Sequence, residues 1–188
     1  MTLIKSISGI RGTIGGKPNN NLTPIDIVES TAAYGTWLIN NFKNEKIKIV
    51  IGRDARISGE MVENLCIGTL QSLGIDVVNL GLSTTPTVEI AVPIEKAHGG
   101  IIITASHNPK EWNALKLLNN KGEFISAEDG QLLLNIIEEN DFNFCHVDNI
   151  GIVTQNETYF SKHIEEVLKI SKVDINAIKK ANLTVVID

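Results

Sequence analysis

Reactive and cationic side chains gather in three short segments of the sequence. The first is G-I-R-G at 9–12, the second is G-R-D-A-R-I-S-G at 52–59, and the third covers residues 104–116. A glycine-rich turn lets the backbone approach a phosphate closely, and a guanidinium such as that of Arg11 can bind the phosphate through two hydrogen bonds. A serine hydroxyl such as that of Ser106 is a weak nucleophile that needs a base or a prior phosphorylation. These residue types suit a site for a small anion with a nucleophilic serine.

Each of these features also has a structural interpretation. Ser106 could cap a helix while His107 packs against the protein, and Lys116 could be a solvated residue of an edge strand. The charged residues of 53–56 could form a local ion-pair network, since clustered charges usually have structural partners. A Ser-His-Asp hydrolase fits less well, because an adjacent serine and histidine on an extended loop point apart and the sequence has no G-x-S-x-G elbow. The residue types alone leave these alternatives open.

Helix and strand patterns alternate along the chain, which is typical of a layered α/β fold. A strand is predicted in the apolar run before Gly9, followed by a glycine-rich turn that contains Arg11. Thr23 and Pro24 have the residue types of a helix N-cap and a first helical position. Further strands are predicted at 47–51, 75–80, 100–104, 114–118 and 183–187, and further helices begin near 58 and 85 and cover 128–139, 155–170 and 174–181. Two of the three reactive segments follow a predicted buried strand, where ligands bind in open α/β sheets.

Composition narrows the class of protein. With 43% hydrophobic and 21% charged residues over 188 positions, the chain is typical of a globular protein. Its net charge of -5 argues against a nucleic-acid binder with a basic face, although a local cluster of Arg and Lys can still bind an anionic substrate. We expect no signal peptide and no membrane helix. Cys66 and Cys145 show neither a disulfide framework nor a metal-ligand spacing, so a reducing, cytoplasmic setting is expected.

Three motifs in register carry a resemblance to a known family. The run T-A-S-H-N-P at 104–109, which continues as K-E-W-N-A-L-K to Lys116, resembles the active-serine loop of the phosphohexomutases. This family includes phosphoglucomutases, phosphomannomutases and phosphoglucosamine mutases. The segments at 9–12 and 52–59 match two further motifs of the family in the same order, and the resemblance extends from about residue 4 to the end of the chain.

The resemblance implies a fold and a division into domains. Residues 1–153 would form a three-layer α/β/α sandwich with a mixed sheet, which is the family's first domain and carries the serine loop. Residues 154–188 would be the start of a second, similar domain. The sequence departs from the family in two places: it has N-A-L-K at 113–116 where N-G-x-K is common, and the D-G-D-G-D-R metal loop is absent. We therefore expect these 188 residues to be an incomplete fragment that is inactive on its own.

The resemblance also implies an activity. Members of the family are isomerases that move phosphate between the 1- and 6-positions of a hexose or hexosamine phosphate through a phosphoserine. Mg2+ is the metal and a hexose 1,6-bisphosphate is the activator. We favour phosphoglucosamine mutase or phosphoglucomutase, with a sugar phosphate as the partner and neither nucleic acid nor membrane. Two alternatives stay open: a serine-dependent phosphatase and a non-catalytic sugar-phosphate binding module.

Roles for single residues follow from matching positions in the motifs. By resemblance, Ser106 would carry the phosphate and, once phosphorylated, would bind the metal through it. Arg11 and Lys116 would flank the transferring group, with Lys116 also a general acid/base candidate. His107 would take part in catalysis, and both His107 and Asn108 would shape the loop and contact substrate. The further phosphate-binding candidates are Gly12, Arg53 and Arg56. These positive charges agree with the demands of phosphoryl transfer.

Overall fold

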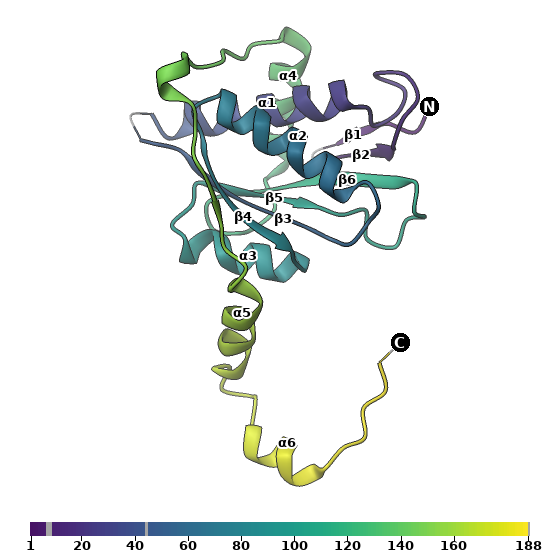
Figure 1. The fold of residues 1–188 in the computed structure, drawn as a ribbon, viewed down its shortest axis with the longest axis vertical. Helices are drawn as coiled ribbons and strands as arrows, with labels where there is room; N and C mark the ends of the chain where they lie inside the picture. Colours follow the sequence, from purple (N-terminus) through teal and green to yellow (C-terminus); the bar gives the residue numbers. More distant parts are fainter. Residues whose placement is uncertain (7–8, 44, 188) are drawn as a thin grey trace.

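The computed structural model describes residues 1–6, 9–43 and 45–187. In these residues, seven strands form one sheet in the order β1-β2-β6-β5-β3-β4-β7. The strands are β1 Ile4–Ser6, β2 Gly9–Thr13, β3 Lys48–Arg53, β4 Asp76–Leu82, β5 Gly99–Ile103, β6 Trp112–Leu118 and β7 Val153–Gln155. The helices are α1 Pro24–Asn41, α2 Gly59–Ser72, α3 Thr85–Ile94, α4 Ala127–Glu139, α5 Tyr159–Leu168 and α6 Ile175–Ala181, with a 3-10 turn at Val147–Asn149. Figure 1 shows α1, α2 and α4 on one side of the sheet and α3 on the other, which confirms the predicted three-layer sandwich.

The sheet is mixed, as expected, and the directions of its strands decide which loops meet. β3 pairs in parallel with β4 on one side and with β5 on the other. β6 runs antiparallel between β5 and β2. The carboxyl ends of β3 and β5 therefore lie at the same edge of the sheet. The segment 53–59 leaves from β3 there, and the serine loop, residues 104–112, leaves from β5 and ends at the first residue of β6.

The two faces of the sheet are both buried, which explains the apolar runs in the sequence. In β5, Ile101 and Ile103 belong to the larger apolar cluster, together with residues of α1, α2 and α4. Ile102 lies between them in sequence and belongs to the smaller cluster, with residues of α3. Successive side chains of a strand point to opposite faces, so a strand covered on both sides is apolar throughout. The core thus holds β5 in place and fixes the point from which the serine loop leaves the sheet.

A buried tyrosine ties α1 to the strands that carry the serine loop. The hydroxyl oxygen of Tyr34 lies 3.1 Å from the carbonyl oxygen of Gly100 and 2.6 Å from that of Leu118. Burial raises the pKa of Tyr34 above its ordinary value. A Cβ at Gly99 would lie 2.2 Å from the same hydroxyl oxygen, so this position accepts only glycine without a shift of α1.

The predicted start of α1 is confirmed, and a glycine marks the end of α2. Thr23 is the N-cap of α1 and Pro24 its first residue, and the backbone N–H of Thr23 donates to Asp26 Oδ2 at 3.0 Å. α2 ends at Ser72, and Gly74 follows with a φ of 79°. Glycine is favoured just past a helix end because it adopts this left-handed conformation without a Cβ clash.

Two predictions from the sequence were wrong. Arg11 does not lie in a turn, because Gly9–Thr13 forms β2 and pairs with both β1 and β6. The run 183–187 forms no strand; Val186 and Ile187 are both 89% exposed. A strand needs a neighbour that pairs its backbone groups, and no described strand lies beside this run.

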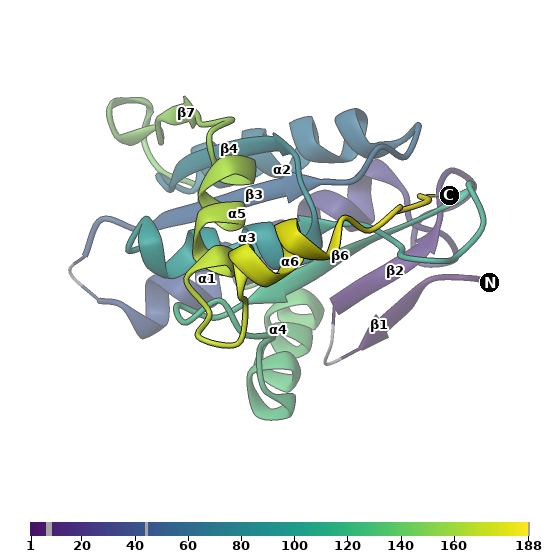
Figure 2. The same ribbon diagram turned by 90° about the horizontal axis from the view of Figure 1, so that it is seen from below.

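The chain after α4 first packs back onto the sheet and then leaves it. β7 extends the sheet by pairing in parallel with β4, and Tyr159 at the start of α5 is buried beside α3. The expected boundary after residue 153 falls inside β7, and the division into two domains stays a prediction. From Tyr159 onward, α5 and α6 extend away from the sheet; seen from below, β1 and β7 mark its opposite edges (Figures 1 and 2). Among the described helices, none is long and apolar enough to cross a membrane.

Candidate functional site

Ser106 occupies an unusual backbone conformation at the start of the serine loop. Its φ is 56°, in the left-handed region that residues with a Cβ seldom adopt. The backbone N–H of Ser106 donates to Thr104 Oγ1 at 3.0 Å. The Ser106 side chain is exposed, and its Oγ makes no hydrogen bond to any residue that the structure describes. The loop thus presents a free hydroxyl beyond the carboxyl end of β5.

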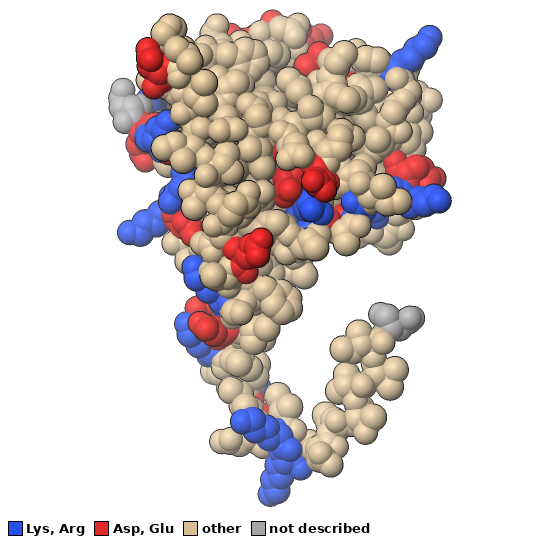
Figure 3. Space-filling view, viewed as in Figure 1, with Lys and Arg blue, Asp and Glu red and all other residues tan. Residues whose placement is uncertain are grey.

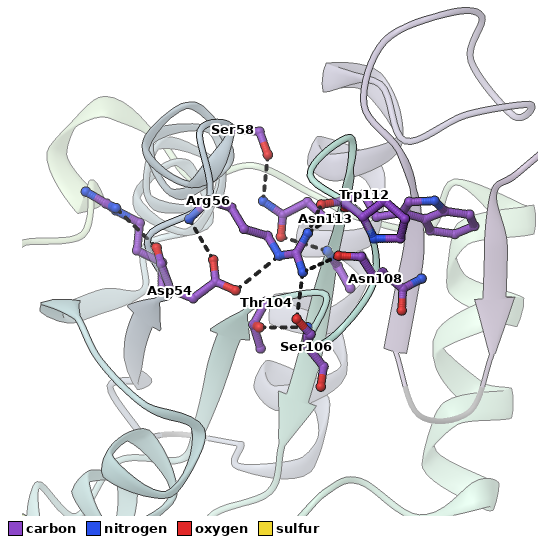
Figure 4. A network of polar contacts seen from close by, with 11 residues as sticks. Asp54, Arg56, Ser58, Thr104, Ser106, Asn108, Trp112 and Asn113 are labelled. Atoms are coloured by element: carbon purple, nitrogen blue, oxygen red, sulfur yellow. Dashed lines mark hydrogen bonds and ion pairs between the residues drawn. The ribbon is translucent and has the colours of Figure 1, made fainter. Parts of the chain in front are cut away.

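A single arginine from the segment after β3 holds the backbone of the serine loop (Figure 4). Arg56 Nε donates to Asp54 Oδ2 at 3.2 Å, and Asp54 Oδ1 accepts the backbone N–H of Arg56 at 3.0 Å. The terminal nitrogens of Arg56 donate to four backbone carbonyl oxygens, those of Ser106 (2.7 Å), Asn108 (2.8 Å), Pro109 (2.8 Å) and Trp112 (3.0 Å). The Arg56 side chain is only 11% exposed.

A second link between the same two segments joins side chains. Asn113, in β6, is fully buried, and its Nδ2 donates to Ser58 Oγ at 2.9 Å. Its Oδ1 accepts the backbone N–H of Ala114 at 2.8 Å. A buried amide must have such partners to avoid a large desolvation cost. Asn113 therefore fixes the N-terminus of α2 against β6, beside the serine loop.

Arg53 is held mainly by a buried carboxylate. Its Nε donates to Glu63 Oε2 at 3.2 Å, and its Nη1 donates to the carbonyl oxygen of Asp54 at 3.3 Å. Among the described residues, no hydrogen-bond partner contacts Arg53 Nη2. Arg53 also lines a surface pocket to which Phe160 of α5 contributes. The local ion pair considered from the sequence is the one between Arg56 and Asp54, whereas Arg53 pairs with Glu63 farther along the chain and keeps one guanidinium nitrogen available for an anion.

Arg11 and Lys116 lie on one face of the sheet. Arg11 is the register partner of Ala114, two residues before Lys116, and Lys116 is the partner of Ile102. Diagonal neighbours of this kind are about 7–8 Å apart at Cα, within reach of long side chains. Because Ile102 belongs to the cluster that packs on α3, both cations project on the α3 side. Arg11 is exposed and Lys116 half-buried, with its Nζ 5.9 Å from the centroid of the Phe124 ring.

The other predicted site residues have different surroundings. His107 is exposed and makes no hydrogen bond to the described residues, including Ser106. Asn108 contributes its carbonyl to Arg56, and its N–H donates to the carbonyl oxygen of Ala105 at 3.1 Å. Gly12 is buried, and a Cβ there would lie 3.1 Å from the backbone nitrogen of Leu22. Close packing accounts for glycine at this position, and its contact with phosphate stays a prediction.

Comparison with known families decides which proteins this chain is related to. Residues 3–144 match the family model for phosphoglucomutase/phosphomannomutase, alpha/beta/alpha domain I. The chain belongs to this family. The matched region includes β1 to β6 and all three motif segments.

Relatives with curated names agree with this assignment. The chain is 36% identical over 179 residues to a phosphoglucomutase/phosphomannomutase from Thermococcus kodakarensis, covering 94% of this chain and 38% of that protein. It is 37% identical over 154 residues to a phosphoglucosamine mutase from Methanococcus maripaludis, covering 82% of this chain and 32% of that protein. A crystal structure of a phosphoglucomutase/phosphomannomutase family protein from Burkholderia thailandensis shares the fold, with a TM-score of 0.75 at 22% identity over 89% of this chain and 35% of that one. The chain thus spans well under half the length of these relatives.

The carboxylates near the serine loop have partners within the protein. Among the described residues, no group of three or more His, Cys, Asp and Glu side chains is placed to hold a metal ion. Asp54, which belongs to the network around the serine loop, already accepts two hydrogen bonds from Arg56. The binding of a metal through the phosphate of Ser106 stays a prediction.

Sequence reasoning placed the serine loop but missed two residues that hold it. Thr104 and Asn113 were noted only as letters of the motif, yet both are buried polar residues with partners in the network of Figure 4. A polar residue such as Asn113 inside an otherwise apolar strand is the signal that could have identified it. Elsewhere on the molecule, Lys and Arg lie interspersed with Asp and Glu on the face that Figure 3 shows.

Proposed function

We propose that these residues form the first part of a phosphohexomutase that moves phosphate between the 1- and 6-positions of a hexose or hexosamine phosphate. The observation that carries the proposal is Ser106, an exposed serine with an unengaged hydroxyl in the motif position of a family member. Curated relatives are named both phosphoglucosamine mutase and phosphoglucomutase/phosphomannomutase, so the substrate is proposed to be a phosphate of glucosamine or glucose.

The proposed chemistry is a pair of phosphoryl transfers. A sugar hydroxyl oxygen attacks the phosphorus of phosphorylated Ser106; the new P–O bond forms as the bond to Ser106 Oγ breaks. The sugar hydroxyl loses its proton and Ser106 Oγ gains one, and Lys116 is the candidate for passing it. The resulting bisphosphate then returns its other phosphate to Ser106. Arg11 would place positive charge beside the transferring oxygens, which is the main demand of this chemistry.

Two further parts of the proposal rest on the family resemblance. A hexose 1,6-bisphosphate would supply the first phosphate to Ser106, and bound Mg2+ would add positive charge at the phosphoryl oxygens.

Cys66 and Cys145 are both free thiols, so a cytoplasmic setting stays a prediction from cysteine use.

Mapping the phosphosite is the direct test of this function. The full-length protein, treated with glucose 1,6-bisphosphate, should carry one stoichiometric phosphate on Ser106, as measured by intact-mass and peptide mass spectrometry. The Ser106→Ala variant should lose mutase turnover by at least roughly 10³-fold, the scale on which removal of a nucleophile acts. Its free energy of unfolding should change by no more than about 0.5 kcal/mol, because Ser106 is exposed.

The controls separate the alternatives. Ser171→Ala removes an exposed hydroxyl far from the loop and should keep wild-type turnover. Steady release of inorganic phosphate in place of glucose 6-phosphate would support the phosphatase instead. The 188-residue chain, assayed beside the full-length protein, should bind sugar phosphate weakly and convert none. Phosphate found on another serine, with Ser106 clean, would refute the assignment.

A further inference from the structure

All five N–H donors of Arg56 are engaged inside the protein. A guanidinium carries five such donors and no acceptor. One of them reaches Asp54 and the other four reach backbone carbonyl oxygens of the serine loop, none farther than 3.0 Å away. A phosphate could bind Arg56 only if one or more of these carbonyls lost its donor. All four bonds come from a charged donor, and those to Asn108 and Trp112 lie in partly buried surroundings, so this exchange is disfavoured.

The carbonyls that Arg56 holds belong to a segment with little other support. Residues between β5 and β6 have no ladder of strand hydrogen bonds, and Ser106 sits in the disfavoured left-handed region. Such a conformation persists only when the surroundings determine it. Two contacts do so here: Thr104 Oγ1 accepts the N–H of Ser106, and Arg56 Nη2 donates to its carbonyl oxygen. Together they fix the peptide groups on both sides of Ser106.

We propose that Arg56 is a positioning residue that sets the direction of the Ser106 hydroxyl and does not itself bind phosphate. The proposal rests on the proposed function of Ser106 and deepens it. It replaces the role expected for Arg56 from the motif, while Arg53, which keeps one nitrogen unengaged, remains a phosphate-binding candidate. Asp54 has a supporting role, because it holds the Arg56 guanidinium and its backbone N–H at once.

The Arg56→Lys variant tests the proposal in the full-length protein. Lysine keeps the positive charge but offers three donors at one point, so it cannot reach four separate carbonyls. We expect kcat to fall by about 10²-fold, the effect of misplacing a reacting group by about 1 Å, while KM for glucose 1-phosphate changes by less than about threefold. Amide hydrogen exchange of peptides that cover 104–112 should become faster, with exchange in β3 and β5 unchanged.

Matched variants keep the test decisive. Lys110→Ala removes an exposed cation from the same loop, where it makes no hydrogen bond to the described residues, and should leave kcat and loop exchange at wild-type values. Asp54→Asn loses the charge partner of Arg56 and should show the same pattern at smaller amplitude; it serves as the test if Arg56→Lys fails to fold. A rise in KM at constant kcat, or unchanged exchange in the loop, would overturn the proposal. Full activity in Ser106→Ala would instead defeat the proposed function, whatever Arg56 does.

Discussion

The serine loop and the segment after Tyr159 differ in what holds them in place. Residues 104–112 have almost no regular secondary structure, yet Arg56 from another segment and Thr104 of the loop itself fix their backbone at Ser106 and at several carbonyls. Residues 160–187 contain most of α5 and all of α6, yet most of their large apolar side chains are exposed. Tertiary contacts, and not helical or strand hydrogen bonds, decide how firmly a segment is placed.

Removal of one positive charge should lower kcat/KM near the serine loop and leave it unchanged in the segment after Tyr159, and this is the largest difference that we expect between the two regions. Arg11→Ala and Lys116→Ala, made in the full-length protein, should each lower kcat/KM by roughly 10²–10³, the scale of losing one contact to transition-state charge. Lys180→Ala, on the exposed face of α6, removes the same charge and should leave kcat/KM unchanged. The measurement is a coupled assay of glucose 1-phosphate conversion. Equal rates in all three variants would show that Arg11 and Lys116 serve only the fold.

Limited proteolysis would compare the two regions in the 188-residue chain directly. A protease of broad specificity should cut first within 169–187, because these residues are exposed and pack on little else. The serine loop should resist, although it is also at the surface, since Arg56 holds it. Mass spectrometry of the early fragments should find a resistant product that ends near Leu168. First cleavage inside the serine loop would reverse the comparison.

The junction between the two regions should depend on Tyr159. Its hydroxyl donates to Glu95 Oε1 at 2.7 Å, and Tyr159→Phe should lower the free energy of unfolding by about 1 kcal/mol, the usual worth of one hydrogen bond. Burial, and then the bond to Glu95, raise the pKa of Tyr159 above its ordinary 10.0. Because the folded state holds this proton more tightly, the contribution is complete below pH 10 and is lost as the pH rises further.

Urea unfolding of both proteins at pH 8 and at pH 10.5 checks this expectation. The difference between wild type and Tyr159→Phe should be smaller at the higher pH. A difference that grows with pH would mean that the hydroxyl is not held in its protonated form by the fold.

Much of the fold could be predicted because buried strands and helix caps require particular residue types at neighbouring positions of the sequence. β5 reads as an apolar run since both of its faces are covered, and Thr23-Pro24 marks the start of α1 since the cap uses adjacent residues. The same kind of pattern gave a wrong prediction at 183–187, where an apolar run forms no strand because it lacks a partner strand. Arg11 was misplaced because four glycines within residues 9–16 suggested a turn, whereas pairing with β6 extends the chain there.

The sequence by itself determined the family, the alternating α/β pattern and the place of the serine loop in the chain, because each depends on residues close together in the chain. Only the tertiary structure decided what Arg56 contacts. Its carbonyl partners lie 50 or more residues away, and a carbonyl oxygen leaves no trace in the choice of amino acid. The face shared by Arg11 and Lys116 was likewise set by the register of β2 on β6, a long-range pairing that no local pattern encodes.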